Sequence, residues 1–254
     1  MTSLEHMKSR ILSINKKFLL NELENLDVLV VPGFQGINER REITTLGRGG
    51  SDTSAVAVAA AMDAECIIYT DVEGVFTTDP NIVPNAKKIN KISYEEMLEL
   101  ASQGAKVLQT RSVELAMRKN TKLSVRSSLK PKKIGTIITD EKSVLEKNTV
   151  SGIAYTKDEA KITLSRVLDK PGVSSKIFGP LAKGNINVDM ILQNISQDGK
   201  FANLSFTLPR ADLEKALKIL KKEKSKIGYK KIISSNNISK ISVVGVGMRS
   251  HAGV

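Results

Sequence analysis

A glycine-rich stretch, residues 44–53, holds the side chains in this sequence that are best suited to chemistry. It reads TTLGRGGSDT and leads into an apolar segment. Gly49 and Gly50 let the backbone approach a ligand closely, and free N–H groups at a helix start bind carboxylate or phosphate. Arg48 can bind a carboxylate through two hydrogen bonds, and Asp52 can accept an ammonium group. Together these groups suit an amino acid.

A simpler interpretation fits the same residues. Ser51 or Asp52 could cap the helix while the glycines form a tight turn, an arrangement that is common before helices. The stretch is neither a P-loop nor a GxGxxG motif, so no familiar phosphate-binding pattern decides the matter. Spacing alone leaves both interpretations open.

A second polar stretch, residues 70–80, reads TDVEGVFTTDP and begins where the apolar run Glu65–Tyr69 ends. Ligands of open α/β sheets lie outside the carboxyl ends of strands, so this loop is well placed for a nucleotide. Asp71 and Asp79 are candidates to orient a metal or a ribose, although either also fits a plain turn. Lys106 is a candidate to meet phosphate, with a solvated helix lysine as the simpler interpretation.

The elements that must position these residues follow from apolar periodicity. Val28–Val31, before a Pro-Gly pair, predicts a buried strand, and Glu65–Tyr69 predicts a second one. Between them Ala55–Met62 is apolar on every side, as expected of a helix packed inside a layered fold. Strand, helix and strand in this order indicate an α/β fold.

Further along, a capping box at Ser93–Glu96 predicts a helix that ends at Gly104. A second helix is expected over Ala105–Lys119 and a strand over Leu123–Arg126. The polar, basic and proline-containing segment that follows places a domain boundary near Gly135.

Beyond that boundary the pattern becomes a βαββαβ unit with a ferredoxin-like layout. Strands are expected at 161–167, 186–194, 201–207 and 229–234, with a helix over 172–183 closed by Gly184 and a lysine-rich helix after residue 212. Ile162–Leu164 leading to Gly172 is echoed by Ile241–Val243 leading to Gly253, which predicts the first strand of a second such unit. The predicted domains are therefore 1–134, 135–238 and 239–254.

Composition narrows the function classes. The 254 residues carry a net charge of +12, but the densest basic run, 215–231, has apolar residues at helical spacing, so its lysines form the wet face of a helix. We therefore predict no nucleic-acid partner, because the positive charge is the one feature that favours it. No run reaches transmembrane length and no signal peptide is visible, so no membrane role is predicted. The single Cys66 offers neither a disulfide framework nor a Cys-based metal site, which favours a cytoplasmic setting.

The order of the motifs resembles a known family. Residues 28–128 contain GFQG, TTLGRGGSDTSA, YTDVEGVFTTDP, ISYEEMLELASQGAKVLQ and VRSS in that order. This series resembles the aspartate kinases of the amino-acid-kinase family. Residues 161–208, with ITLSRVLDKPGV and INVDMILQNIS, are similar to the first regulatory ACT domain of those enzymes. The implied fold is a partial three-layer αβα amino-acid-kinase domain followed by a ferredoxin-like ACT domain.

The resemblance implies a reaction and a set of residues. ATP would phosphorylate the side-chain carboxylate of L-aspartate with Mg²⁺, giving 4-phospho-L-aspartate for lysine, threonine and methionine biosynthesis, mostly through positioning and charge neutralisation. The catalytic candidates are Arg48 and Asp52, and no residue is assigned as a metal ligand. The matched substrate-binding positions are Phe34, Arg48, Gly49, Gly50 and Ser51. The matched ATP-binding positions are Thr70, Asp71, Phe76, Thr77, Thr78, Asp79, Pro80, Asn81 and Lys106.

For the ACT unit the resemblance implies binding of lysine and/or threonine as effectors, and assembly into a homo- or hetero-oligomer through ACT domains. The matched effector-binding positions are Asp169, Ser174, Asn187, Val188, Asp189 and Gln193. Residues 169–172 also fit a plain turn into a helix with proline near its first position.

The sequence also departs from the family pattern. The family begins with a lysine-bearing, glycine-containing strand and loop that bind phosphate, and nothing like it precedes Val28 here. Asn81, Phe76 and Thr110 stand where arginine, tyrosine and proline are usual. A non-catalytic regulatory subunit or an inactive fragment is therefore the alternative. We expect the chain alone to show little or no aspartate-dependent ATP turnover and to bind lysine or threonine as a dimer.

Overall fold

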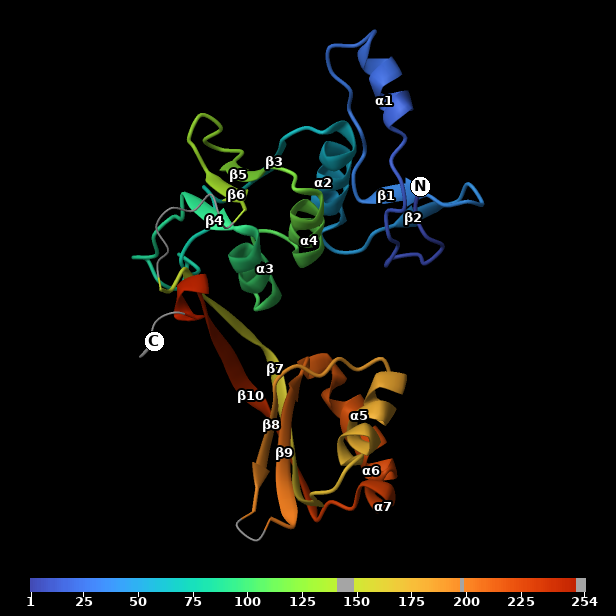
Figure 1. The fold of residues 1–254 in the computed structure, drawn as a ribbon, viewed down its shortest axis with the longest axis vertical. Helices are drawn as coiled ribbons and strands as arrows, with labels where there is room; N and C mark the ends of the chain where they lie inside the picture. The colour runs from blue at the N-terminus through green and yellow to red at the C-terminus, as the bar shows by residue number, and fades with distance from the viewer. Residues whose placement is uncertain (141–148, 197–198, 250–254) are drawn as a thin grey trace. The chain divides into compact units, whose positions relative to one another are not determined.

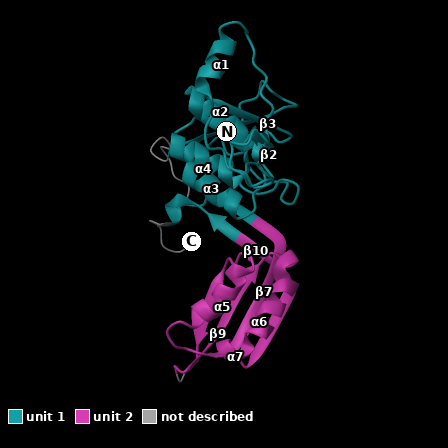
Figure 2. Ribbon diagram, turned by 90° about the vertical axis from the view of Figure 1, so that its right-hand side faces the viewer, with its two compact units in different colours: residues 1–154, 242–254 teal, residues 155–241 magenta. Residues whose placement is uncertain are grey.

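The computed structural model describes residues 1–140, 149–196 and 199–249 (Figure 1). The chain forms two compact units, which Figure 2 distinguishes by colour. The first unit comprises residues 1–154 and 242–254, and the second comprises residues 155–241. The long strands β7 and β10 contribute to both units, because each crosses a boundary between them.

The first unit is built on a four-stranded mixed sheet in the order β3-β5-β6-β4. β3 and β5 are parallel, β5 and β6 antiparallel, and β4 and β6 parallel. Thr70 and Ser127, the last residues of β3 and β5, therefore pair at one edge, where the polar loop 70–80 begins. The strands are β3 (Cys66–Thr70), β4 (Lys91–Ser93), β5 (Leu123–Ser127) and β6 (Thr136–Thr139).

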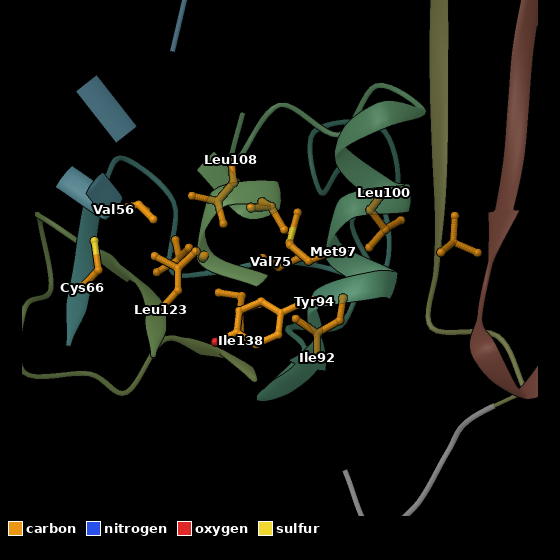
Figure 3. Packing of buried hydrophobic residues seen from close by; sticks show 14 of the residues in the cluster. Val56, Cys66, Val75, Ile92, Tyr94, Met97, Leu100, Leu108, Leu123 and Ile138 are labelled. Atoms are coloured by element: carbon orange, nitrogen blue, oxygen red, sulfur yellow. The ribbon is translucent and has the colours of Figure 1, made fainter. Parts of the chain in front are cut away.

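Three helices pack with this sheet around one apolar core (Figure 3). They are α2 (Gly50–Met62), α3 (Tyr94–Ser102) and α4 (Thr110–Lys119). Val56 of α2, Met97 of α3 and Leu123 of β5 are at most 1% exposed in this core. Helix α2 confirms the buried helix predicted over Ala55–Met62, and β3 confirms the strand predicted over Glu65–Tyr69.

The predicted capping box at the start of α3 is also confirmed. The Ser93 side chain accepts a hydrogen bond from Glu96 N at 3.1 Å, and Glu96 Oε2 accepts one from Ser93 N at 3.2 Å. The helix ends before Gly104, whose φ of 115° suits a residue without a Cβ.

The helix predicted from Ala105 begins later, at Thr110, so its first turn was wrongly placed. Ala105 N donates to Leu100 O at 2.9 Å, which closes the end of α3 instead of starting a new helix. The chain then reaches Gln109, the N-cap of α4, in an extended conformation. Residues 105–109 are therefore a connection, and this matters because they carry Gln109 to the glycine-rich loop.

The predicted buried strand at Val28–Val31 is wrong. These residues take no part in a sheet, and Val30 is 86% exposed. An apolar run becomes a buried strand only where a neighbouring strand and a covering layer are available. Among the described residues, the nearby elements are instead α1 (Lys16–Leu23) and a short antiparallel pair, β1 (Gln35–Ile37) with β2 (Ile43–Thr45).

The second unit has the predicted βαββαβ order, and its sheet order β10-β7-β9-β8 is that of a ferredoxin-like fold. Helices α5 and α6 supply Ile177 and Leu220 to a core that also contains Leu164 and Phe206. The elements are β7 (Gly152–Leu168), α5 (Val173–Lys183), β8 (Ile191–Ile195), β9 (Phe201–Leu208), α6 (Leu213–Lys222), α7 (Lys224–Ile227) and β10 (Lys231–Val244), with short 3-10 turns at Arg210–Asp212 and Val246–Arg249.

Several boundaries differ from the prediction. The strand expected from residue 186 begins at Ile191, where its pairing with β9 starts opposite Phe206. Just before it, Asp189 N donates to Thr207 O and Thr207 N donates to Met190 O. Ile241–Val243, expected to open another unit, are the continuous end of β10. The Gly253 of the predicted repeat lies outside the described residues. The first compact unit continues past Gly135 through β6.

The core of the first unit yields a stability prediction. Replacing Met97, which is fully buried, by alanine should lower the free energy of unfolding by about 2–5 kcal/mol, because the cavity cannot fully collapse. Met117 on α4 is 39% exposed, so Met117→Ala is a matched control that should cost under about 1 kcal/mol. Urea unfolding followed by circular dichroism measures both. Equal losses for the two variants would contradict the core assignment.

Candidate functional site

The glycine-rich loop leads into α2 through backbone conformations that favour glycine. Gly47 has a φ of 82°, and Gly49, the N-cap of α2, has a φ of 67°. Because Gly49 has no side chain, it makes no capping hydrogen bond, and the N–H groups of Ser51 and Asp52 bond to no described residue. The simpler interpretation, in which Ser51 or Asp52 caps the helix, is therefore not the geometry found. The helix start is an open site for an anion.

The N-cap residue and the first turn of α4 clamp this loop. A Cβ added to Gly49 would lie 1.6 Å from Gln109 Cγ, so the Gln109 side chain rests directly on the Gly49 backbone. The half-buried Arg111 donates through Nη1 to Leu46 O at 2.9 Å and through Nη2 to Ser9 O at 3.0 Å. One charged hydrogen bond and one close contact thus hold the loop, and the second hydrogen bond of Arg111 joins Ser9 to the same guanidinium group.

Phe34 closes the other side. Its N–H donates to Ser54 Oγ at 3.1 Å, and its carbonyl accepts from Leu46 N at 2.9 Å. A Cβ on Gly50 would lie 3.1 Å from Phe34 Cδ2, and Phe34 itself has a φ of 71°, which is unusual for a bulky residue. The structure therefore brings four of the predicted substrate-binding positions together at one helix start: Phe34, Gly49, Gly50 and Ser51.

Asp52 and Arg48 differ in their surroundings. Asp52 is half-buried, and burial raises the pKa of its carboxyl group, although a backbone hydrogen bond from Gln109 lowers it. Burial, and then the charge of Asp52, raises the pKa of the buried Cys66 thiol from an ordinary 9.0 to about 11. The negative charge of Asp52 is therefore felt by a buried thiol. Arg48 is exposed and makes no ion pair with a described residue, so its guanidinium is available to a ligand.

The predicted ATP-binding residues at the start of loop 70–80 lie at the sheet edge. Thr70 O accepts hydrogen bonds from Ser128 N at 2.8 Å and from Ser128 Oγ at 3.0 Å, which ties the ends of β3 and β5 together. Thr70 Oγ1 donates to Asp71 Oδ1 at 3.0 Å, and Asp71 is exposed.

Backbone and side-chain hydrogen bonds hold the rest of the loop. Thr77 N donates to Lys87 O at 2.8 Å, Lys87 N donates to Thr77 Oγ1 at 3.1 Å, and Phe76 forms a bridge with Lys88. Asp79 Oδ1 accepts from Asn81 N at 2.9 Å, the geometry of a turn. Thr78 and Pro80 are half-buried, and Asn81 is exposed.

Lys106 is exposed and lies three residues before Gln109. The segment that carries the predicted phosphate-binding lysine is therefore the one that clamps the glycine-rich loop. The structure makes this link and the sequence pattern did not.

An ion pair that sequence reasoning missed also shapes this region. Glu73 Oε1 lies 2.6 Å from Lys130 Nζ and 3.6 Å from Lys133 Nζ, so the loop after β5 is tied to loop 70–80. The hydrogen bond from Lys130 is the main reason that the pKa of Glu73 is lowered. Opposite charges 57 residues apart give no sequence signal that they pair.

The effector candidates of the second unit are only partly joined. Gln193 Nε2 donates to Asp169 Oδ1 at 3.0 Å, so these two positions meet. Ser174 is exposed in the first turn of α5, Asn187 is exposed and Val188 is half-buried, and no described hydrogen bond links their side chains to the others. The side chain of Asp189 is 55% exposed and contacts Lys240 Nζ.

Three residues that the sequence analysis did not select are therefore part of these sites: Gln109, Arg111 and Lys240. Only Lys240 had a signal, because in the alternating strand β10 it shares the inward parity of Ile238 and Ser242. The described residues contain no group of three or more His, Cys, Asp or Glu side chains that could hold a metal ion. No helix among them is long and apolar enough to cross a bilayer.

Comparison with known proteins assigns two segments of the chain to known families. Residues 2–127 match the amino acid kinase family, and residues 165–223 match an ACT domain. An aspartate kinase of Pseudomonas putida is 51% identical over 256 residues. Residues 2–127 of the chain belong to the amino acid kinase family. The chain is covered completely in that alignment but spans only 62% of the length of the Pseudomonas relative.

Solved structures of family members have the same fold. Escherichia coli aspartokinase III in complex with aspartate and ADP aligns with a TM-score of 0.77 at 26% identity, covering all of this chain and 57% of the other. The same enzyme in complex with lysine and aspartate aligns with a TM-score of 0.72 at 27% identity, covering 96% of this chain and 55% of the other. The predicted α/β kinase fold followed by an ACT-type unit is thereby confirmed.

The close approach of Gln109 to Gly49 predicts a specific loss and rescue. Gly49→Ala should cost about 1–2 kcal/mol for the left-handed backbone and about 1–3 kcal/mol more for overpacking. Gly172→Ala, at a φ of 85° with nothing within 4 Å, is the matched control and should show the backbone cost alone. Adding Gln109→Ala to Gly49→Ala should restore part of the overpacking cost in urea unfolding, because it removes Cγ and Cδ, 1.6 and 2.4 Å away, while Cβ remains 2.6 Å away. No rescue would show that Gln109 does not cover Gly49.

The position of Asp52 predicts a change in thiol chemistry. Asp52→Asn should lower the pKa of Cys66, because a negative charge that disfavours the thiolate is removed. The rate of iodoacetamide labelling as a function of pH reports it, since Cys66 is the only cysteine. Asp63→Asn, at the exposed C-cap of α2, is the matched control and should leave the pKa unchanged. An unchanged profile in Asp52→Asn would place that carboxylate away from Cys66.

The same shift has a consequence for stability with a definite sign. The folded thiol keeps its proton to higher pH than the unfolded thiol, so this group's contribution to stability is lost as pH rises from about 9 to about 11. In Asp52→Asn that loss should be smaller.

Proposed function

We propose that this chain forms the aspartate-binding side and part of the ATP-binding side of an aspartate kinase, joined to an ACT-type unit that senses an amino acid. The observation that carries the proposal is the start of α2. There an uncapped helix N-terminus, an exposed arginine and a half-buried carboxylate are held in one loop by Gln109, Arg111 and Phe34. This arrangement offers both signs of charge to a zwitterion.

In the proposed reaction an oxygen of the L-aspartate side-chain carboxylate attacks the γ-phosphorus of ATP, and ADP leaves. Both reactants are anionic, so catalysis consists mainly of positioning and of neutralising charge. Arg48 and the free N–H groups of Ser51 and Asp52 bind carboxylate, and the Asp52 side chain accepts the ammonium group. Because the pKa of Asp52 is raised, aspartate binding should weaken on acidification at a higher pH than for an ordinary aspartate.

The ATP side is proposed along the sheet edge. Thr70 and Asp71 lie at the carboxyl ends of parallel strands, the usual place for a nucleotide, and Lys106 would approach the phosphates. Mg²⁺ is commonly held by one or two carboxylates together with phosphate oxygens, so the exposed Asp71 fits this role without a protein cage. When bound, Mg²⁺ would neutralise charge on the transferred phosphoryl group.

Two solved complexes of one relative support the assignment of ligands. The E. coli enzyme was crystallised with aspartate and ADP, and also with lysine and aspartate. For this chain we propose L-aspartate and ATP as substrates, and lysine and/or threonine as effectors at the ACT-type unit. The product would serve lysine, threonine and methionine biosynthesis, in a cytoplasmic setting and in an oligomer formed through ACT domains.

The proposal is tested by aspartate binding. Arg48→Met should weaken L-aspartate binding at least tenfold, because a bidentate charged contact contributes about 1.5–3 kcal/mol. Arg40→Met, another exposed arginine, in the turn between β1 and β2, is the matched control and should bind as the unchanged chain does. Isothermal titration calorimetry with L-aspartate, with and without ADP and Mg²⁺, measures the affinities. Equal affinity in both variants would remove Arg48 from the site and the proposal with it.

A further inference from the structure

A nearly buried ion cluster lies in the second unit and is not explained by the kinase reaction. Lys240 Nζ of β10 contacts Asp189 Oδ2 and lies 3.4 Å from Glu159 Oε1 of β7. The side chains of Lys240 and Glu159 are only 12% and 10% exposed, whereas that of Asp189 is 55% exposed. One ammonium group is thus shared between an interior carboxylate and one that solvent reaches.

The interior carboxylate is incompletely satisfied. Glu159 Oε2 is buried and has no hydrogen-bond partner among the described residues. The nearby Arg210 does not neutralise it, because the guanidinium donates to the main-chain carbonyls of Glu159 at 3.3 Å and Ile238 at 3.4 Å. Two carboxylates therefore compete for a single lysine, and an unpaired buried oxygen is costly.

We infer that Lys240 is a tethered competitor at the effector site, a step that rests on the proposed binding of an amino acid at Asp189. Its ammonium group occupies the Asp189 carboxylate where the ammonium group of a free amino acid would bind. An arriving amino acid displaces Lys240, which moves its hydrogen bonds to Glu159 and satisfies the free Oε2 atom. Displacement therefore leaves no buried charge without a partner, so it costs little.

The burial pattern supports this direction of exchange. Asp189 is open to solvent, so a ligand reaches it without entering the core, while Glu159 is nearly buried and lies within reach of Lys240. Asp189 N donates to Thr207 O at 2.9 Å, which anchors the backbone of the site on β9 during the exchange. Burial lowers the pKa of Lys240, but the hydrogen bond and charge of Asp189 outweigh it and raise the pKa, in keeping with a lysine that stays charged.

The ion cluster is connected to the first unit covalently, through strand β10. Two residues after Lys240, β10 continues into that unit, where Ser242 Oγ donates to Gln103 Oε1 at 2.9 Å at the end of α3. Movement of Lys240 is therefore a movement on a strand whose next inward-facing side chain is bound to a helix of the kinase fold.

The inference predicts that removing Lys240 raises effector affinity while lowering stability. If Lys240 occupies Asp189 in about nine-tenths of molecules, its removal should tighten binding about tenfold. Lys240→Met is compared with the unchanged chain by isothermal titration calorimetry with L-lysine and with L-threonine. Lys231→Met, at the exposed start of β10, is the matched control and should not change affinity. Asp189→Asn should abolish binding in either background.

Lys240→Met leaves Glu159 unpaired, so the double variant Lys240→Met with Glu159→Gln serves where the single one unfolds, as judged by circular dichroism. A merely structural lysine would lose affinity and stability together. Unchanged or weaker binding in the folded variant would overturn the inference and leave effector binding in place. Absence of binding both with and without Lys240 would overturn the inference and the proposed effector role together.

Discussion

The constraint on which the candidate kinase site depends is the clamp on the glycine-rich loop. Gly49 can adopt its left-handed conformation and accept the Gln109 side chain only because it has no Cβ, and Arg111 holds the carbonyls of Leu46 and Ser9 from the same direction. The clamp holds the loop that delivers Arg48 to the start of α2, where the helix itself orients the N–H groups of Ser51 and Asp52. The cost of ordering a ligand site is thereby met on folding and not on binding.

Helix α3 also holds the two chain segments that lead to the second unit. Glu96 of α3 uses Oε2 in the capping box with Ser93, while its Oε1 accepts hydrogen bonds from Ser151 Oγ and from Val246 N at 3.4 Å. Ser151 immediately precedes β7 and Val246 follows β10, so one carboxylate holds both chain segments that lead to the second unit. The capping glutamate was evident from its spacing, but its second partners are 55 and 150 residues away.

The sequence predicted elements whose causes are local and missed those whose causes are distant. Apolar periodicity and the Ser93 box specify α2, β3 and α3, and the βαββαβ order of the second unit follows from the same periodicity. The strand predicted at Val28–Val31 was wrong because a buried strand needs a neighbouring strand to pair with, and the local sequence pattern does not show whether one is present. The glycine-rich loop was found because its residue types are unusual, whereas Gln109 and Arg111 are ordinary residues whose role comes from packing against it.

The two candidate sites use charge in opposite ways. At the start of α2, Arg48 makes no ion pair with a described residue, and no described cation perturbs the Asp52 carboxylate, so under the proposed function a zwitterion would displace no partner. At Asp189 the carboxylate is already occupied by Lys240. Under the proposed function, an amino acid at the first site would gain its full electrostatic contact, but at the second it would gain only the difference between its own contact and that of the tethered lysine. The second site would then respond only when the free amino acid is abundant, which is the property that the proposed feedback requires.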